Sequence, residues 1–197
     1  MYKQYSSGWI EVICGCMFAG KSEELIRRIN TLEYAKKNII VFKPLIDDRY
    51  SEDEIASHKG NKIKCYSISR SKDILKFIEN DTDVVAIDEV QFFDENIIPI
   101  CEMLADKQIR VMVAGLDKDF KGKPFYIMSE LLARAEFVTK LSAICVKCGA
   151  PATITQRLVN NKPASYKDPI ILIGASESYE ARCRHCHIVE DKPKIKL

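Results

Sequence analysis

The stretch that decides the fold is residues 10–29, and its centre reads Gly15-Cys16-Met17-Phe18-Ala19-Gly20-Lys21-Ser22. This pattern, G-x-x-x-x-G-K-S, is typical of a loop that binds nucleotide phosphates through its backbone N–H groups. The apolar residues 10–14 before it predict a buried strand, and residues 22–29 after it predict a helix. We therefore expect Lys21 to reach the β- and γ-phosphates and the Ser22 hydroxyl to bind Mg²⁺. The alternative is a glycine-containing turn before a core helix.

Apolar runs and helical patterns alternate along the rest of the first 141 residues. Strands are predicted at 38–42, 63–66, 84–89, 109–114 and 137–141, and helices at 71–79, 97–105 and 128–133. This alternation predicts an α/β fold with a parallel sheet covered by helices. Together with the glycine loop, it resembles the RecA-like fold of the P-loop NTPases. Ser71 is the expected N-cap of the helix over 71–79. Residues 45–62 are polar and predict a long loop, of the kind that is often functional.

Two carboxylates follow the predicted strand that begins at Val84. Asp88 is expected to hold Mg²⁺ directly or through water, and Glu89 to orient a nucleophile or accept its proton. A water nucleophile would make the protein an ATPase and a substrate hydroxyl would make it a kinase, and the two carboxylates do not decide between them. Arg49, in the polar loop, is a candidate for neutralising the transferring phosphoryl group, although such an arginine is more often a solvated surface charge.

Four of the eight cysteines form two C-x-x-C pairs, Cys145 with Cys148 and Cys183 with Cys186. Paired C-x-x-C motifs predict a tetrahedral zinc site. Four thiolates fill all four coordination positions and leave none for a substrate, so such a site is structural. The alternative is four reduced cysteines without a metal.

The segment between the pairs, 149–182, is longer than the about 15–20 residues of a plain zinc ribbon. We therefore expect it to loop out as a lid from a zinc-anchored base. Short strands are predicted in it at 152–155 and 170–173, and a domain boundary near 142 would divide the chain into domains 1–142 and 143–197. His185 and His187 are alternative ligands, although both pairs are complete without them.

Composition narrows the function classes. The 30 basic and 28 acidic side chains nearly cancel, and a net charge of +2 gives no case for a nucleic-acid partner. No apolar run approaches the ~20 residues that cross a bilayer, and the first eight residues lack the apolar core of a signal peptide. We therefore expect a cytoplasmic protein without a membrane partner. Five aromatic residues could stack on a flat ligand, but their spacing favours the core: Phe92, Phe93, Phe120, Phe125 and Tyr179.

Taken together, the motifs resemble those of the small, zinc-containing thymidine kinases of the cellular type (type II), from Gly15 to Cys186. Besides the glycine loop and the cysteine pairs, the resemblance rests on Asp47-Asp48-Arg49-Tyr50, Asp88-Glu89-Val90-Gln91-Phe92-Phe93, Leu116-Asp117-x-x-Phe120, Lys123-Pro124-Phe125 and residues 174–179. The chain departs from the family at Cys16, Ala19 and Asp48, where proline or serine, serine, and threonine are more usual. The loop works through backbone N–H groups, so the first two departures remove no needed donor. Cys16 could be accessible in such a loop.

The resemblance implies transfer of the ATP γ-phosphate to the 5′-hydroxyl of thymidine, and of deoxyuridine, in pyrimidine deoxynucleoside salvage. It implies Glu89 as general base, Arg49 as a charge-stabilising arginine and Asp47 as a carboxylate near the magnesium. It implies a substrate pocket lined by Met17, Phe92, Leu116, Phe120, Phe125, Thr155 and Tyr179, and by a lasso loop over 170–179 that includes Ile170, Ile171, Leu172, Ile173 and Gly174. It also implies feedback inhibition by dTTP and a cytoplasmic homotetramer.

Two other classes of function compete with this one. A P-loop ATPase that acts on DNA would use Glu89 to polarise water, and a zinc-ribbon binding module would have no catalysis. The near-neutral charge and the expected lid argue against the first, and the phosphate loop with Asp88 and Glu89 argues against the second.

Overall fold

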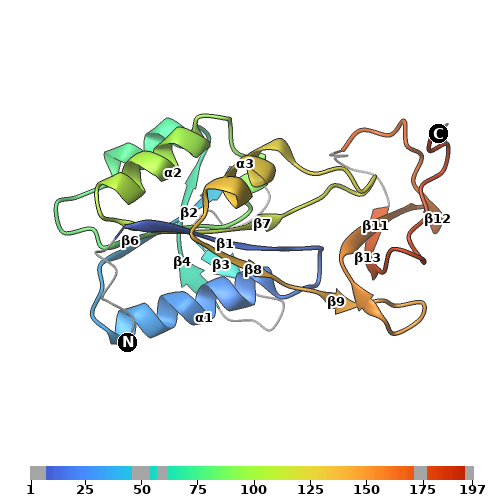
Figure 1. The fold of residues 1–197 in the computed structure, drawn as a ribbon, viewed down its shortest axis with the longest axis horizontal. Coiled ribbons are helices and arrows are strands. Elements are labelled where there is room, and N and C mark those ends of the chain that lie inside the picture. Colours follow the sequence, from blue (N-terminus) through green and yellow to red (C-terminus); the bar gives the residue numbers. More distant parts are fainter. Residues whose placement is uncertain (1–7, 46–53, 57–61, 171–176, 194–197) are drawn as a thin grey trace.

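The computed structural model describes residues 8–45, 54–56, 62–170 and 177–193 (Figure 1). Its centre is a six-stranded sheet in the order β5-β2-β6-β7-β1-β8, in which every neighbouring pair is parallel. The strands are β1 (Trp9–Gly15), β2 (Ile39–Pro44), β5 (Tyr66–Ile68), β6 (Val84–Ile87), β7 (Arg110–Leu116) and β8 (Phe137–Lys140). The α/β prediction is confirmed.

Helices cover both faces of this sheet, α1 (Lys21–Tyr34) on one, and α2 (Ile97–Asp106) and α3 (Tyr126–Arg134) on the other (Figure 1). Along β1, Ile13 packs with the buried residues of α1, whereas Val12 and Cys14 pack with those of α2 and α3. A strand that is buried on both faces carries apolar residues at successive positions, which is why Val12, Ile13 and Cys14 show no alternation. Among the described residues, no helix is long and apolar enough to span a bilayer.

Two predicted elements near the polar loop are wrong in part. Within 45–62 the structure has a strand, β3 (Glu54–Ala56), which pairs antiparallel with β4 (Lys62–Lys64). The single strand predicted over 63–66 divides at the buried Cys65, because β4 belongs to this hairpin and β5 to the main sheet. Alternation alone cannot tell which sheet a residue joins. Residues 46–53 and 57–61 lie outside the described part of the chain.

The helix predicted over 71–79 is a shorter 3-10 helix, η1 (Ser71–Lys76), and Ser71 is not its N-cap. Arg70 holds the N-cap position, and Ser71 instead donates its hydroxyl to Asp94 Oδ1 at 2.6 Å and its backbone N–H to Oδ2 at 2.8 Å. The carboxylate from a distant segment thus binds the start of the helix. A second 3-10 helix, η2 (Val90–Phe92), follows β6.

The C-terminal part contains two small antiparallel sheets. One pairs β9 (Ala143–Ile144) with β10 (Pro151–Ala152), and the other has the order β12-β11-β13, with β11 (Ile154–Val159), β12 (Lys162–Pro163) and β13 (Glu177–Arg182). The strand predicted over 152–155 is interrupted at Thr153. Ile170 is in no strand, and the rest of the strand predicted over 170–173 lies outside the described residues.

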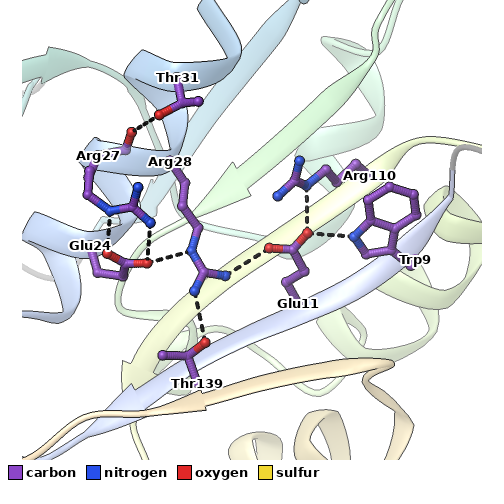
Figure 2. A network of polar contacts seen from close by, with 8 residues as sticks. All are labelled: Trp9, Glu11, Glu24, Arg27, Arg28, Thr31, Arg110 and Thr139. Atoms are coloured by element: carbon purple, nitrogen blue, oxygen red, sulfur yellow. Dashed lines mark hydrogen bonds and ion pairs between the residues drawn. The ribbon is translucent and has the colours of Figure 1, made fainter. Parts of the chain in front are cut away.

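A polar network joins four elements of the main domain around Glu11, which is only 5% exposed (Figure 2). Its carboxylate accepts a hydrogen bond from Trp9 Nε1 at 2.5 Å and forms ion pairs with Arg28 of α1 at 2.8 Å and Arg110 of β7 at 2.6 Å. Arg28 continues to Thr139 of β8 at 2.8 Å. A buried carboxylate that is paired in this way stabilises the fold, and losing it would take away the anion that Arg110 pairs with, whereas Arg28 would still pair with Glu24 at 2.8 Å.

We expect Glu11→Gln to destabilise the fold by about 1.5–3 kcal/mol at pH 7. Burial acts to raise the pKa of Glu11, but the bonds from Arg110 and Trp9, together with the nearby charges, outweigh it and lower the pKa below 4.5. The stabilisation is therefore present above about pH 4.5 and is lost as the pH falls through the folded-state pKa. Urea unfolding at pH 7 and at acid pH measures both effects. The exposed Glu102→Gln is the control, and equal losses from both variants at pH 7 would contradict the network's role.

Candidate active site and four-cysteine cluster

The glycine loop lies between the end of β1 and the start of α1, as its motif predicts. Gly15 has φ 154°, and a Cβ there would lie 2.6 Å from the Leu141 carbonyl oxygen. Gly20, the N-cap of α1, has φ 82° in the left-handed region. Both glycines are thus required by backbone geometry. The loop also contains Phe18, which is half exposed, and Ala19, which packs near the cysteines.

The two polar side chains of the motif have partners that define the site. The buried Lys21 curls back over the loop, and its ammonium donates to the Cys16 carbonyl at 3.0 Å. The Ser22 hydroxyl donates to Asp88 Oδ2 at 2.8 Å. The structure thus brings together the start of α1 and the carboxyl end of β6, which are far apart in sequence.

Asp88 is buried at this junction. Burial, and then the neighbouring charge of Glu89, raise the pKa of Asp88 to about 7, although the Ser22 hydrogen bond acts in the opposite direction. A buried carboxylate beside a second carboxylate is stabilised as an anion by a cation. Hydroxyl and carboxylate oxygens are the hard ligands that Mg²⁺ takes in phosphoryl-transfer sites, so this pair fits that ion.

Glu89 follows in a left-handed backbone conformation, with φ 49° and ψ 39°. Such a conformation in a residue with a side chain costs of order 1 kcal/mol and is concentrated at functional sites. Its N–H donates to Asp88 Oδ1 at 2.9 Å, and its carboxylate accepts from Gln91 Nε2 at 2.5 Å. Gln91 Oε1 in turn accepts from the Leu116 N–H at 3.0 Å. In the sequence, Gln91 was only one residue of the motif over 88–93, and no role was predicted for it.

The residues predicted to line a substrate pocket come together in pairs. The Met17 N–H donates to the Thr155 hydroxyl at 3.0 Å, which joins the glycine loop to β11. The rings of Phe92 and Phe125 meet edge to face, with centroids 6.1 Å apart.

The other predicted pocket residues are placed separately. Leu116 ends β7, and Tyr179 lies on β13 opposite Arg157. Asp47, Arg49, Ile171, Leu172, Ile173 and Gly174 lie outside the described residues. Of the five aromatics assigned to the core, Phe93 and Phe120 are buried there, whereas Phe92, Phe125 and Tyr179 are half-buried, so that prediction is wrong in part.

Sequence reasoning missed Arg157, a fully buried arginine on β11. Its Nη1 donates to the Pro169 carbonyl at 2.7 Å, and its guanidinium lies 5.1 Å from the centre of the Phe120 ring. It therefore fixes the chain just before Ile170 against the 117–125 loop. Its neighbours in sequence carry no motif that marks Arg157 as functional. Its role follows only from its partners Pro169 and Phe120, which lie elsewhere in the chain.

His187 contacts the same loop. Its Nε2 lies 2.8 Å from the Phe120 carbonyl, and burial lowers its pKa, so a neutral ring donates there.

The four cysteines of the two C-x-x-C pairs converge, with all their sulfurs within 4.8 Å of one another. Cys148 Sγ and Cys183 Sγ are 3.6 Å apart, close to the about 3.8 Å edge of a tetrahedron with 2.3 Å zinc–sulfur bonds. Hydrogen bonds to the sulfurs of Cys148 and Cys183, and then burial, raise the pKa of Cys186 to about 12. Four sulfurs this close together are compatible with a structural zinc ion.

This cluster packs directly on the glycine loop. Cys16 belongs to the same buried group as Cys145 and Cys183, and its thiol donates to the Ala152 carbonyl at 3.3 Å. Cys16 is 1% exposed, so the expectation that it could be accessible is wrong, because β10 covers it.

A glycine loop between a parallel strand and a helix, with a hydroxyl bonded to a carboxylate at the carboxyl end of another strand of the sheet, defines the class of α/β proteins that bind nucleotide phosphates. The chain matches the family model described as thymidine kinase over residues 8–187. It therefore belongs to the thymidine kinase family, and it is a phosphotransferase that acts on thymidine. This match favours the kinase over the DNA-dependent ATPase and the zinc-ribbon module that the sequence left open.

Proposed function

We propose that the enzyme transfers the γ-phosphoryl group of ATP to the 5′-hydroxyl of thymidine, with Mg²⁺. The single observation that carries this proposal is the hydrogen bond between Ser22 and Asp88, with Glu89 as the next residue. It supports the proposal because Ser22 of the glycine loop, Asp88 and Glu89 lie together at the carboxyl edge of the sheet, which is the edge where α/β enzymes bind their substrates.

The glycine loop from Gly15 to Ser22 holds the phosphates of ATP in this proposal. Its backbone N–H groups and the N-terminus of α1 supply positive potential. In the structure, the ammonium of Lys21 donates a hydrogen bond to the Cys16 carbonyl at 3.0 Å. A phosphate oxygen is charged and is therefore a stronger acceptor for this ammonium. A bound triphosphate therefore draws Lys21 off the loop carbonyl.

Ser22 and Asp88 would hold the magnesium ion, together with Asp47, which we assign from its sequence motif alone. When bound, Mg²⁺ neutralises charge that develops between the β- and γ-phosphates. Glu89 accepts the proton of the nucleoside hydroxyl, and Arg49 stabilises the transferring group. Phosphoryl transfer has a loose transition state, so the placement of Glu89 matters more than its basicity.

The nucleoside would bind between the glycine loop, β7 and the C-terminal part. Met17 and Thr155, which already contact each other, would lie at the thymine methyl, with Leu116, Phe92, Phe125, Phe120 and Tyr179 around the ring. The lasso loop over 170–179 would supply backbone donors and acceptors, and Arg157 supports its entry through the Pro169 carbonyl.

We expect deoxyuridine to be a poorer substrate than thymidine. A missing methyl group in an apolar pocket costs only ~1–3 kcal/mol, which lowers kcat/KM roughly 10- to 200-fold. Competition between the two nucleosides at equal concentration measures this ratio, with product quantified by mass. Equal rates would contradict a methyl pocket at Met17 and Thr155.

One assay tests the reaction itself. ATP labelled at the γ-phosphate is offered with thymidine, deoxycytidine, deoxyguanosine or DNA, and transfer to the nucleoside is compared with release of phosphate. Transfer to thymidine supports the proposal, and release that DNA stimulates without any transfer would contradict it.

The remaining parts of the proposal concern control and assembly. Because dTTP carries both a thymidine and a triphosphate, it can occupy both subsites at once and inhibit. We further propose a P-loop domain over 1–142, a zinc-binding domain over 143–197, and a cytoplasmic homotetramer. The half-exposed Phe137 and Val138 on the edge strand β8 support self-association, which light scattering measures.

A further inference from the structure

We propose that Gln91 positions the carboxylate of Glu89 for phosphoryl transfer, an inference that rests on the proposed role of Glu89 as general base. Gln91 acts through Glu89 and is therefore a positioning residue.

The amide of Gln91 is bonded at both ends. Its Oε1 accepts from the Leu116 N–H at 3.0 Å, and its Nε2 donates to Glu89 Oε2 at 2.5 Å. A backbone N–H can only donate, so the oxygen of the amide must face Leu116. The nitrogen must then face Glu89. The main chain of β7 thus sets the orientation of this amide. The amide nitrogen in turn fixes where Oε2 of Glu89 can lie.

The surroundings of Gln91 are built around its amide. The side chain is 6% exposed, and burying an amide is costly unless both ends are hydrogen-bonded. Its neighbour Gly115 leaves space for it, because a Cβ on Gly115 would lie 2.4 Å from Gln91 Oε1. Val90 and Met128 are the other side chains closest to that point, and both are apolar. An amide in such surroundings calls for a polar role, and its bond to Glu89 supplies one.

The backbone of Glu89 needs such support. It is in the left-handed region, and the 3-10 turn that follows it is closed by the Phe92 N–H donating to the Glu89 carbonyl at 3.1 Å. Gln91 lies on that turn and ties it to β7. The same bond links Glu89 to Leu116, which we assign to the nucleoside pocket. Gln91 therefore fixes the position of Glu89, the proposed base, relative to Leu116, the proposed pocket residue. A misplacement of a catalytic group by about 1 Å can lower the rate about 10²-fold.

Two variants separate the two ends of the amide. Gln91→Leu removes both bonds, whereas Gln91→Glu keeps an oxygen for the Leu116 N–H but replaces the donor to Glu89 by a second carboxylate, which repels it. We expect both to lower kcat about 10- to 100-fold while the KM for thymidine changes less than about threefold. If only Gln91→Leu lost turnover, the bond to Leu116 would be what matters, and the proposal would be overturned. Gly115→Ala, which crowds the amide, is expected to lower kcat in the same way.

A double-mutant cycle with Glu89→Gln decides whether Gln91 acts through Glu89. In the Glu89→Gln background, Gln91→Glu should lower kcat by less than about twofold, because the group it positions is already gone. An equal loss in both backgrounds would overturn the proposal. Near-normal turnover of Glu89→Gln alone would instead show that the proposed base is wrong. Zinc content and thermal midpoint confirm folding, and Gln91→Glu decides if Gln91→Leu does not fold.

Discussion

Glu89→Gln is expected to lower kcat by at least ~10² while ATP binding stays largely intact. The substitution keeps the shape of the side chain but removes the group that we propose takes the proton of the nucleoside hydroxyl. In the proposed site, ATP is held by Lys21, Ser22 and backbone N–H groups of the glycine loop, and the side chain of Glu89 is none of these groups. Stopped-flow or steady-state turnover gives kcat, and calorimetric titration with a non-hydrolysable ATP analogue gives the affinity.

The matched control is Glu95→Gln, which removes one carboxylate from an exposed position six residues further along the chain. It should leave kcat near that of the unmodified enzyme. Near-normal turnover of Glu89→Gln under saturating substrates would remove Glu89 as the base. A parallel loss of ATP affinity would show that the substitution had disturbed the phosphate site.

Cys183→Ser is expected to lose the metal and, with it, most of the activity. Three thiols cannot complete the tetrahedron that the four sulfurs form within 4.8 Å of one another. Structural zinc contributes folding energy directly, and a loss of ~3 kcal/mol corresponds to roughly 6–12 °C of thermal midpoint in a chain of this size. Because the cluster packs on Cys16, the KM for ATP should rise together with that for thymidine. Metal analysis, thermal unfolding and steady-state kinetics measure these effects.

Cys65→Ser provides the comparison, since it removes a buried thiol that is far from the cluster in sequence and belongs to the group packed under α1. Its metal content should equal that of the unmodified protein. Retained metal and activity in Cys183→Ser would count against the anchoring role of the cluster. A thymidine-specific loss, with ATP affinity unchanged, would show that the cluster supports only the nucleoside side of the site.

Local patterns predicted most of the main sheet. The strands at 84–87 and 111–114 are continuous apolar runs, and the strand over 10–14 is apolar except at Glu11, as expected for a parallel sheet that is buried on both faces. The glycine loop was also predictable, because its motif consists of residues that are adjacent in sequence. The four cysteines converge as their paired spacing indicated. Family membership followed from the combination of these motifs rather than from any one of them.

Features that depend on distant partners could not be predicted in this way. The start of η1 is bound by Asp94, so Ser71 showed a capping pattern without being the cap. Gln91 and Arg157 gain their roles from the Leu116 N–H and the Pro169 carbonyl, and nothing in their own neighbourhood marks those partners. The burial of Cys16 likewise depends on a strand more than 130 residues away.

The network around Glu11 lies near the beginning of β1, whereas the glycine loop begins at its end, about 13 Å further along an extended strand. Substitutions that far apart, without shared partners, have additive effects. The stability that this network gives against heat and acid is therefore adjustable separately from the rate of catalysis. Directed evolution could select stabilising substitutions near the start of β1 without lowering kcat.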